Sequence, residues 1–334
     1  MAGSGLKGHR SCKPPAAMPH PITRRLALAI PLLLSSSSCI RKKTKIVVGF
    51  SQMENNNPWR IAETNSMKQE AARRHATYEL IVTDAQGQTA KQVADVEDLV
   101  ARRVSALFLA PREYEGLSPA LDSAMELKIP VFLIDRQAAG KAGEDYVSFL
   151  GSDFIQQARR VAEWLIHHTG GKASIVELTG TVGSSVALDR SRGFAEGIAG
   201  HPGMRIIASQ TADFSRATAQ GVMENIVQVK GGEMTAVYAH NDEMALGAIG
   251  ALKAAGKRPG TDVLVVSIDG EKAALQAIIR GEMSATAESN PHFGPLAFHT
   301  LDQFRRGEKI PDKIILEDKF FDGSNAREFV SQAY

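Results

Sequence analysis

The stretch "KIVVGFSQMENNNPWR", Lys45–Arg60, decides the fold class. Its first half is a short apolar run rich in β-branched residues, which predicts a buried strand. Asn57 and Pro58 then give the signature of a helix start, because asparagine is a favoured N-cap and proline suits the first helical position. A buried strand that passes directly into a helix predicts the first part of a βαβ unit, with Trp59 and Arg60 at the mouth of its helix.

The same alternation of apolar runs and amphipathic segments continues along the chain. Helical spacing of apolar residues marks segments such as 89–104 and 154–168. The strand candidates are 45–50, 79–84, 106–111, 131–136, 146–151, 174–180, 204–210, 235–241, 263–269 and 284–289. Strands that are apolar almost throughout and joined by helices predict an α/β fold, with parallel sheets covered on both faces.

About ten strands are too many for one open sheet in a compact domain. We therefore predict two doubly wound parallel-sheet lobes joined by a hinge, with crossings near Ser152, Glu288 and Gly307. In this division the N-terminal lobe comprises residues 45–152 and 289–309. The C-terminal lobe comprises residues 153–288 and 310–334.

Residues 1–39 have the pattern of an export leader. A basic start at Arg24 and Arg25 precedes a nine-residue apolar run and a small-residue stretch that ends at Cys39. Nine residues span about 14 Å as a helix, well short of the ~30 Å core of a bilayer, so the run predicts a signal peptide and not an anchor. Met18 is the predicted start of translation. Lipid attachment at Cys39, cleavage elsewhere and twin-arginine export all stay open, and each predicts a location outside the cytoplasm, in the periplasm.

The charge and the cysteines exclude several classes of protein. Residues 1–39 carry five basic and no acidic residues, so removing them from the net charge of +2 leaves −3 for residues 40–334. A mildly acidic body argues against a nucleic-acid partner. No cysteine follows Cys39, and no glycine-rich phosphate loop follows the first strand, so we expect no metal and no cofactor.

In doubly wound sheets, ligands bind outside the carboxyl ends of the strands. The residues at these positions are aromatic, cationic, acidic or amide side chains. They are Asn56, Asn57, Trp59, Arg60, Asp135, Arg136, Arg190, Phe214, Asn241, Asp269 and Glu288. We expect them to meet in a cleft between the lobes.

This mixture of aromatic, charged and amide side chains suits a sugar ligand. A sugar ring has apolar C–H faces that pack on an aromatic ring, and each hydroxyl both donates and accepts hydrogen bonds. Carboxylates and amides accept from these hydroxyls, whereas guanidinium groups donate to them.

Several of these residues also fit structural roles. Trp59 fits a place in the core, and Asp135 with Arg136 fits an ordinary turn. Asn241 or Asp242 fits the N-cap of the following helix. Arg190 is expected at the opening of a helix, where the helix dipole disfavours a cation and a ligand or acidic partner would compensate.

The segments that carry these residues resemble those of a known family. "NNNPW", "LIDRQA", "ADFSRATAQGVMENI", "HNDEMALGAIGALKAAGK" and "SIDG" occur in the order found in the periplasmic pentose- and hexose-binding proteins of bacterial ABC importers. The likeness runs from about Lys45 to Tyr334. Within that family, "VELTGTVGSSVALDRSRGFAEGI", "VYAHNDEMALGAI" and the Trp59-Arg60 pair are most similar to the galactofuranose-binding protein.

The resemblance implies a type I periplasmic binding protein fold and a receptor without enzymatic activity. Trp59 and Phe214 would sandwich the sugar ring, and the polar residues would bind its hydroxyls. Whether Glu288 or Ser289 faces the sugar stays open. The implied mechanism is hinge closure around a monosaccharide, followed by docking of the monomeric receptor on the membrane permease of an ABC importer.

Three other classes share part of this pattern. A repressor of the lactose-repressor class requires a helix-turn-helix before the first strand, where this chain has its leader. A glycosidase would use a carboxylate pair such as Asp135 and Asp269, but each has a neighbouring arginine or amide suited to keeping it ionised. A receptor for ribose, inositol or a furanosyl signal differs only in its ligand.

Overall fold

The computed structural model describes residues 44–334. The predictions about the leader, Met18 and Cys39 lie outside the described residues. Within residues 44–334, no helix combines the length and the apolar character needed to cross a membrane.

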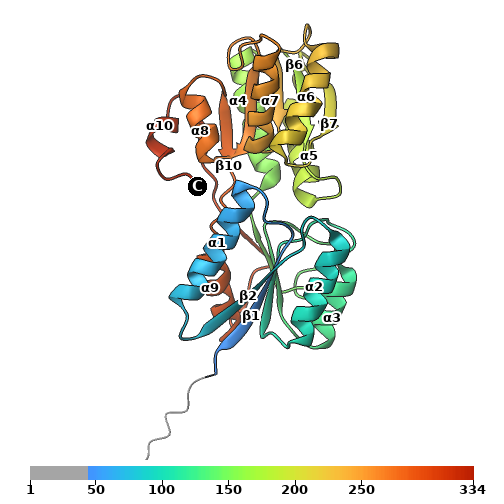
Figure 1. Ribbon diagram of the computed structural model, residues 1–334, viewed down its shortest axis with the longest axis vertical. Helices are drawn as coiled ribbons and strands as arrows, with labels where there is room; N and C mark the ends of the chain where they lie inside the picture. The colour runs from blue at the N-terminus through green and yellow to red at the C-terminus, as the bar shows by residue number, and fades with distance from the viewer. Residues whose placement is uncertain (1–43) are drawn as a thin grey trace, which may run out of the picture. The chain divides into compact units, whose positions relative to one another are not determined.

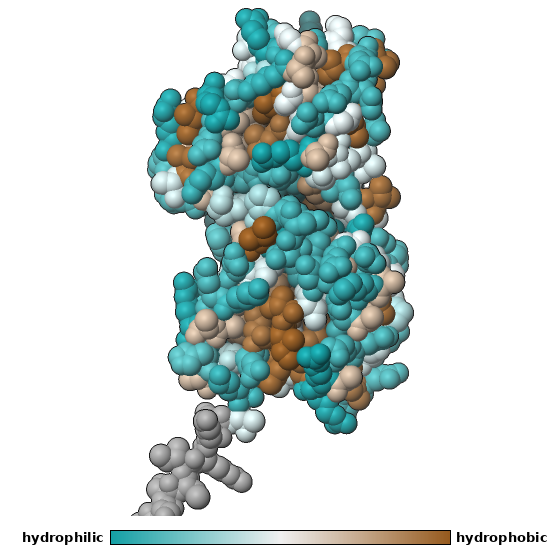
Figure 2. Space-filling model, in the orientation of Figure 1, coloured by the Kyte–Doolittle hydropathy of each residue, from teal (hydrophilic) through white to brown (hydrophobic). Residues whose placement is uncertain are grey.

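The first sheet contains six parallel strands in the order β11-β5-β4-β3-β1-β2. Its strands are β1 (Ile46–Gln52), β2 (Tyr78–Asp84), β3 (Ala106–Leu109), β4 (Val131–Ile134), β5 (Ser148–Gly151) and β11 (Lys313–Ile315). Helices α1 (Pro58–Arg73) and α9 (Gly294–Arg305) cover one face, and α2 (Thr89–Ala101) and α3 (Ser118–Glu126) cover the other (Figure 1). A hydrophobic patch lies over the edge strand β2 (Figure 2).

The second sheet has the order β12-β10-β9-β8-β6-β7, and β12 alone runs antiparallel to its neighbour. Its strands are β6 (Ala173–Thr179), β7 (Met204–Thr211), β8 (Ala236–Ala239), β9 (Leu264–Asp269), β10 (Ala285–Glu288) and β12 (Phe320–Asp322). Its helices are α4 (Phe154–Thr169), α5 (Ser185–Ile198), α6 (Arg216–Lys230), α7 (Asp242–Ala254), α8 (Lys272–Ile279) and α10 (Ala326–Phe329). These sheets confirm the prediction of two α/β lobes.

Alternate residues of each strand enter different cores, as the two-residue period of a strand requires. In β3, Phe108 belongs to the cluster beneath α1 and α9, whereas Leu107 and Leu109 belong to the cluster beneath α2 and α3. The second sheet is divided in the same way between α4 with α5 and α6 with α7. Burial on both faces explains why the strands are apolar almost throughout.

Side-chain caps fix the helices at the predicted positions. Asn57 accepts a hydrogen bond from the backbone N–H of Arg60, and Pro58 occupies the first turn of α1. Asn241 caps α7 by accepting from Met244 N. The prediction that Arg190 opens its helix was wrong: Ser184 caps α5, so Arg190 lies in the second turn of that helix.

The chain passes between the two sheets three times. The first crossing is Ser152–Asp153, after β5, and the second is residues 289–293, after β10. The third follows Ile315, because β11 pairs with β5 in the first sheet before β12 joins the second. The sequence placed this crossing near Gly307 and assigned residues 310–334 to the second lobe. Strand pairing places 313–315 in the first sheet.

Candidate functional site

A pocket lies where the carboxyl ends of strands from both sheets meet. Its lining residues are Asn57, Trp59, Arg60, Asp135, Arg136, Val186, Arg190, Phe214, Asn241, Asp269 and Ser289. Its cavity volume is about 30 Å³.

Arg60 is the centre of an ion-pair network on the first-sheet side of the pocket. Its Nη1 lies 2.9 Å from Glu63 Oε2, and its Nη2 lies 2.7 Å from Asp135 Oδ2. Burial would lower the pKa of Arg60, but the charges of Asp135 and Glu63 raise it above its ordinary value. Burial raises the pKa of Glu63 to about 7, against the opposing charge of Arg60. The Arg60 guanidinium therefore stays charged and fixed in orientation.

Trp59 is both a core residue and a pocket residue. It packs against Phe293 with ring centroids 6.3 Å apart, and only 7% of its surface is exposed. Its Nε1 donates to the backbone oxygen of Ser289 at 2.7 Å, and the Arg60 guanidinium carbon lies 4.6 Å from its ring centroid. The two interpretations of Trp59 are therefore compatible, because a ring held rigidly by the core can also present a surface to the pocket.

Arg190 is the corresponding cation on the second-sheet side. Its Nη1 donates to the backbone oxygen of His240, and its Nη2 donates to Gln157 Oε1 at 3.2 Å and to Asp269 Oδ1 at 3.3 Å. Burial raises the pKa of Asp269 well above its ordinary value, although the charge of Arg190 opposes this. The pair is held deep in the structure, with side chains 3% and 7% exposed.

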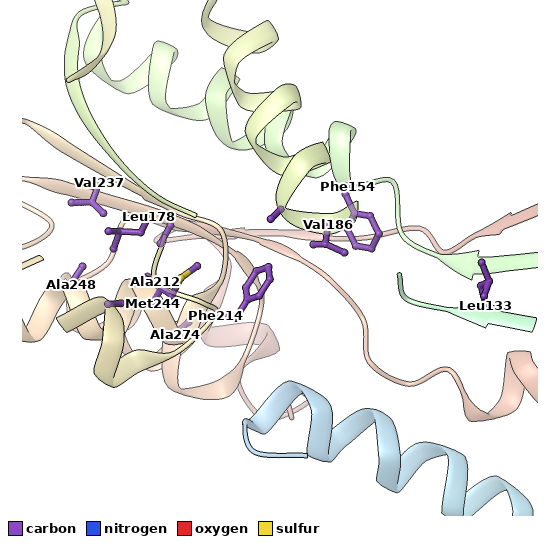
Figure 3. Close-up of a cluster of buried hydrophobic side chains, with 14 of the residues drawn as sticks. Leu133, Phe154, Leu178, Val186, Ala212, Phe214, Val237, Met244, Ala248 and Ala274 are labelled. Atoms are coloured by element: carbon purple, nitrogen blue, oxygen red, sulfur yellow. The ribbon is translucent and has the colours of Figure 1, made fainter. Parts of the chain in front are cut away.

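The Phe214 ring rests directly on the backbone of Gly180. A Cβ atom at Gly180 would lie 1.9 Å from Phe214 Cζ, so only glycine leaves room for the ring at this place. Arg136, from the first lobe, places its guanidinium carbon 5.3 Å from the ring centroid. Phe214 belongs to a cluster of buried hydrophobic side chains that also includes Val186 (Figure 3). The ring is thus supported from behind and faces the opposite lobe.

Three pocket residues have unusual backbone conformations. The φ angles of Asp135, Phe214 and Asp269 are 62°, 56° and 142°. Non-glycine residues with positive φ cost about 1–3 kcal/mol each and persist only where the surrounding structure enforces them. Such strain clusters at functional sites, and here it aims side chains from strand ends into the pocket.

A buried histidine supports the second-lobe wall from behind. The Nε2 of His240 lies 3.1 Å from Glu177 Oε1, and its Nδ1 accepts a hydrogen bond from the backbone N–H of Gly180. Its backbone oxygen accepts from Arg190. Burial lowers the pKa of His240, although Glu177 opposes this, so the imidazole is neutral and Nε2 carries the proton. His240 thereby connects the backbone under Phe214 with the Arg190 guanidinium.

Two pocket-lining guanidinium groups keep donors that nothing in the described part of the chain accepts. The Nε atoms of Arg136 and Arg190 are buried and have no hydrogen-bond partner among residues 44–334. Burial and the nearby charge of Arg60 together lower the pKa of Arg136 to about 9. An unpaired buried donor costs about 1–3 kcal/mol. A ligand with oxygen acceptors would relieve this cost.

The structure brings together nine of the eleven residues predicted from the sequence. They are Asn57, Trp59, Arg60, Asp135, Arg136, Arg190, Phe214, Asn241 and Asp269.

Asn56 and Glu288 do not line the pocket. Asn56 is exposed and donates to Glu54 Oε2 at 3.1 Å. The Glu288 carboxylate turns toward Lys319, whose backbone N–H donates to it at 2.9 Å. Successive strand residues point to opposite sides, and the next residue, Ser289, lines the pocket.

Val186 was missed by the sequence analysis. It lines the pocket from α5 and belongs to the buried core as well. An apolar residue at a helical position ordinarily indicates the core, so the sequence contains no signal for its second contact.

Backbone hydrogen bonds join the two lobes beside the pocket. The N–H of Tyr114 donates to the oxygen of Gly183 at 2.9 Å. The N–H of Gln137 donates to Ser185 Oγ at 2.9 Å. These bonds hold the start of α5 and the loop before it against loops that follow strands of the first sheet.

The pocket has the chemistry of a binding site for a polar solute. Among residues 44–334, no group of three or more His, Cys, Asp or Glu side chains is placed to hold a metal. Two α/β lobes, joined by three crossings and enclosing such a pocket, define a solute-binding protein. The chain belongs to the periplasmic binding protein domain family, which matches residues 48–309. This membership confirms the predicted family and fold, and the prediction that the protein is not an enzyme.

The comparisons with known proteins cover nearly the whole described chain. The chain is 38% identical over 292 residues to the galactofuranose-binding protein YtfQ of Escherichia coli (strain K12), covering 86% of this chain and 91% of that protein. It is 34% identical over 295 residues to the ribose import binding protein RbsB of Haemophilus influenzae, covering 88% and 97%.

A solved structure is similar over a comparable part of the chain. This is the periplasmic binding protein component of the arabinose ABC transporter from Shewanella sp. ANA-3, bound to α- and β-L-arabinofuranose. Its TM-score with this chain is 0.82 at 36% identity, covering 86% of this chain and 95% of that one.

Proposed function

We propose that the pocket binds a neutral monosaccharide in its furanose form and that the protein delivers this sugar to the membrane permease of an ABC importer. The observation that carries the proposal is the pair of buried, unpaired Nε donors on Arg136 and Arg190, one from each lobe. A sugar hydroxyl or ring oxygen accepts from such donors, and one molecule that met both would bridge the lobes.

The charges of the pocket favour a neutral ligand. Three guanidinium groups, on Arg60, Arg136 and Arg190, face two carboxylates, on Asp135 and Asp269. Glu63 adds a third carboxylate, bonded to Arg60 behind the pocket wall. A neutral sugar leaves the ion pairs of Arg60 with Asp135 and of Arg190 with Asp269 intact, whereas an anionic sugar would compete with these carboxylates for the guanidinium groups.

The aromatic residues of the pocket favour a sugar ring. Phe214 and Trp59 supply apolar surface from different lobes, which suits the C–H faces of a ring. Among sugar rings, the furanose form is supported by the chain's similarity to proteins named for galactofuranose and solved with arabinofuranose.

The import role rests on the family and on the two-lobed construction. Closure about the three crossings would bury the sugar and create the surface that the permease recognises. A scavenging receptor works at dilute sugar, so we expect a dissociation constant in the micromolar range or tighter, near −8 kcal/mol.

A thermal-unfolding panel tests the proposal. A ligand at ~100 times its dissociation constant adds about 2.7 kcal/mol of stability. D-galactose and L-arabinose, whose solutions contain furanose forms, are therefore expected to raise the melting temperature, whereas galactose 6-phosphate is not. Locked methyl pyranosides of the same sugars test the ring form. Stabilisation by the pyranosides and not by the free sugars would overturn the furanose assignment, and no stabilisation by any sugar would overturn the function.

NMR of the same samples separates binding from catalysis. A binding protein returns every sugar unchanged after prolonged incubation, and the appearance of a new product would contradict the receptor role.

A further inference from the structure

The carboxylate of Asp318 is linked by hydrogen bonds to the crossings between the lobes. Asp318 lies in the third crossing, between β11 and β12. Its Oδ1 accepts from Ser152 Oγ, in the first crossing, at 3.2 Å. Gln157 Nε2, which donates to Asp318 Oδ2, also donates to the backbone oxygen of Glu288, the residue before the second crossing. Through Gln157, this carboxylate is therefore linked to all three segments whose backbone must rotate when the lobes open.

Gln157 connects this carboxylate to the pocket. Its Nε2 donates to Asp318 Oδ2 at 2.7 Å and to the backbone oxygen of Glu288 at 3.0 Å. Its Oε1 accepts from Arg190 Nη2 at 3.2 Å. Gln157 is 2% exposed, so it has no alternative partner in solvent. Hydrogen bonds thus run without interruption from a pocket guanidinium to the hinge.

We propose that Gln157 and Asp318 are positioning residues that couple occupancy of the pocket to closure of the hinge. The inference rests on the proposed function, since it assumes that a ligand engages Arg190. Sugar that binds Arg190 fixes its guanidinium, the fixed guanidinium orients Gln157, and Gln157 holds the Asp318 carboxylate against the crossings. Neither residue lines the pocket, so their effect on affinity acts through closure and not through contact with the sugar.

The geometry explains how these hydrogen bonds would favour the closed form over the open form. A carboxylate accepts several hydrogen bonds at once, and its bonds are stronger than those of a neutral acceptor. Opening of the lobes rotates the backbone at the crossings, so an open form would lose part of these bonds. Bonds that are made in full only in the closed form favour that form, which is what the coupling requires.

The test compares Gln157→Leu, Asp318→Asn and the double variant with the wild type. Glu317→Gln is the matched control, because Glu317 is the neighbouring acid on the same segment and is exposed. Binding kinetics with D-galactose and L-arabinose give the association and dissociation rates. Small-angle X-ray scattering, with and without sugar, reports closure, and thermal unfolding without sugar confirms that each variant is folded.

We expect each single variant to bind about tenfold more weakly, mainly through faster dissociation, and to become less compact with saturating sugar than the wild type. The double variant is expected to lose no more than about the larger single loss, because both residues belong to one chain of bonds. Affinities equal to that of Glu317→Gln, or losses that add in the double variant, would overturn the coupling.

The proposed function and the coupling fail in different ways. A wild-type protein that binds none of the sugars overturns the proposed function. In a wild-type protein that does bind sugar, closure of Asp318→Asn with saturating sugar equal to that of the wild type and of Glu317→Gln would overturn the role of Asp318 and leave the proposed function intact.

Discussion

Gly180→Ala tests whether Phe214 forms a wall of the sugar site, because it moves the ring without changing a pocket residue. The new Cβ would lie 1.9, 2.2 and 2.4 Å from three atoms of the Phe214 ring. Ordinary contacts begin at 3.4 Å, so the ring must move by about 1.5 Å. Gly180 does not have a positive φ, so alanine adds no backbone strain of its own and the overlap is the whole perturbation.

Gly180→Ala is expected to lower both the folding stability and the affinity for sugar. Overpacking of this kind costs about 1–3 kcal/mol of folding stability. A displaced ring also loses its contact with the sugar, and an aromatic contact contributes about 0.5–1.5 kcal/mol, which corresponds to a two- to tenfold weaker affinity. Calorimetric titration with D-galactose and L-arabinose measures the second effect, and thermal unfolding without sugar measures the first.

Two further variants make the result decisive. Gly49→Ala places a Cβ 3.0 Å from Leu99 Cδ1, in the core of the first lobe, and is expected to lower stability without changing affinity. Adding Gly180→Ala to Phe214→Leu is expected to change affinity little, since the ring it displaces is already gone. A folded Gly180→Ala protein with wild-type affinity would refute the assignment of Phe214 to the site.

Three other predictions follow from single contacts. Arg190→Ala should remove the sugar-induced rise in melting temperature while the protein stays folded, and an unchanged rise would place the ligand elsewhere. Glu288→Gln should leave affinity unchanged, because this carboxylate bonds Lys319 outside the pocket; a large loss would show that the side chain turns inward. Burial raises the pKa of Glu271 to about 10, helped by the charge of Asp242, whereas the unfolded chain loses this proton near the ordinary value of 4.5. The contribution of Glu271 to stability is therefore full below about pH 4.5 and is lost as pH rises toward 10. Glu271→Gln should raise the melting temperature at pH 8 by about 2–4 °C, on the order of 1 kcal/mol, and the gain should vanish at pH 4. A gain that persists at pH 4 would contradict this cause.

Much of the fold follows from patterns that are local in the sequence. Ten strands were predicted from apolar runs because burial on both faces makes such strands apolar almost throughout. The Asn57-Pro58 start of α1 was predicted because capping depends on neighbouring residues only. The short strands β11 and β12 were missed, since three-residue edge strands such as Lys313–Ile315 lack a clear period. The third crossing was misplaced for the same reason.

The sequence predicts which strand ends form the site. It does not predict the direction of each side chain or the contacts behind the pocket. Parallel strands bring their carboxyl ends to one edge of a sheet, which places Asn241 and Asp269 together in the second lobe without further information. Whether Glu288 or Ser289 faces the pocket depends on where β10 ends, because a one-residue shift reverses the side that a strand residue faces. Contacts behind the pocket, such as Gln157 with Asp318, join segments 161 residues apart and have no local signature.

The most direct test of the account uses Trp59 as a reporter of the pocket. The chain has two tryptophans, and Trp164 lies outside the pocket lining, where it donates to Asp322 at 3.0 Å. Fluorescence titration of the Trp164→Phe protein with D-galactose and L-arabinose therefore observes Trp59 alone. The account predicts a saturable change in emission with a dissociation constant in the micromolar range or tighter. Emission that stays constant up to millimolar concentrations of every sugar tested would contradict it.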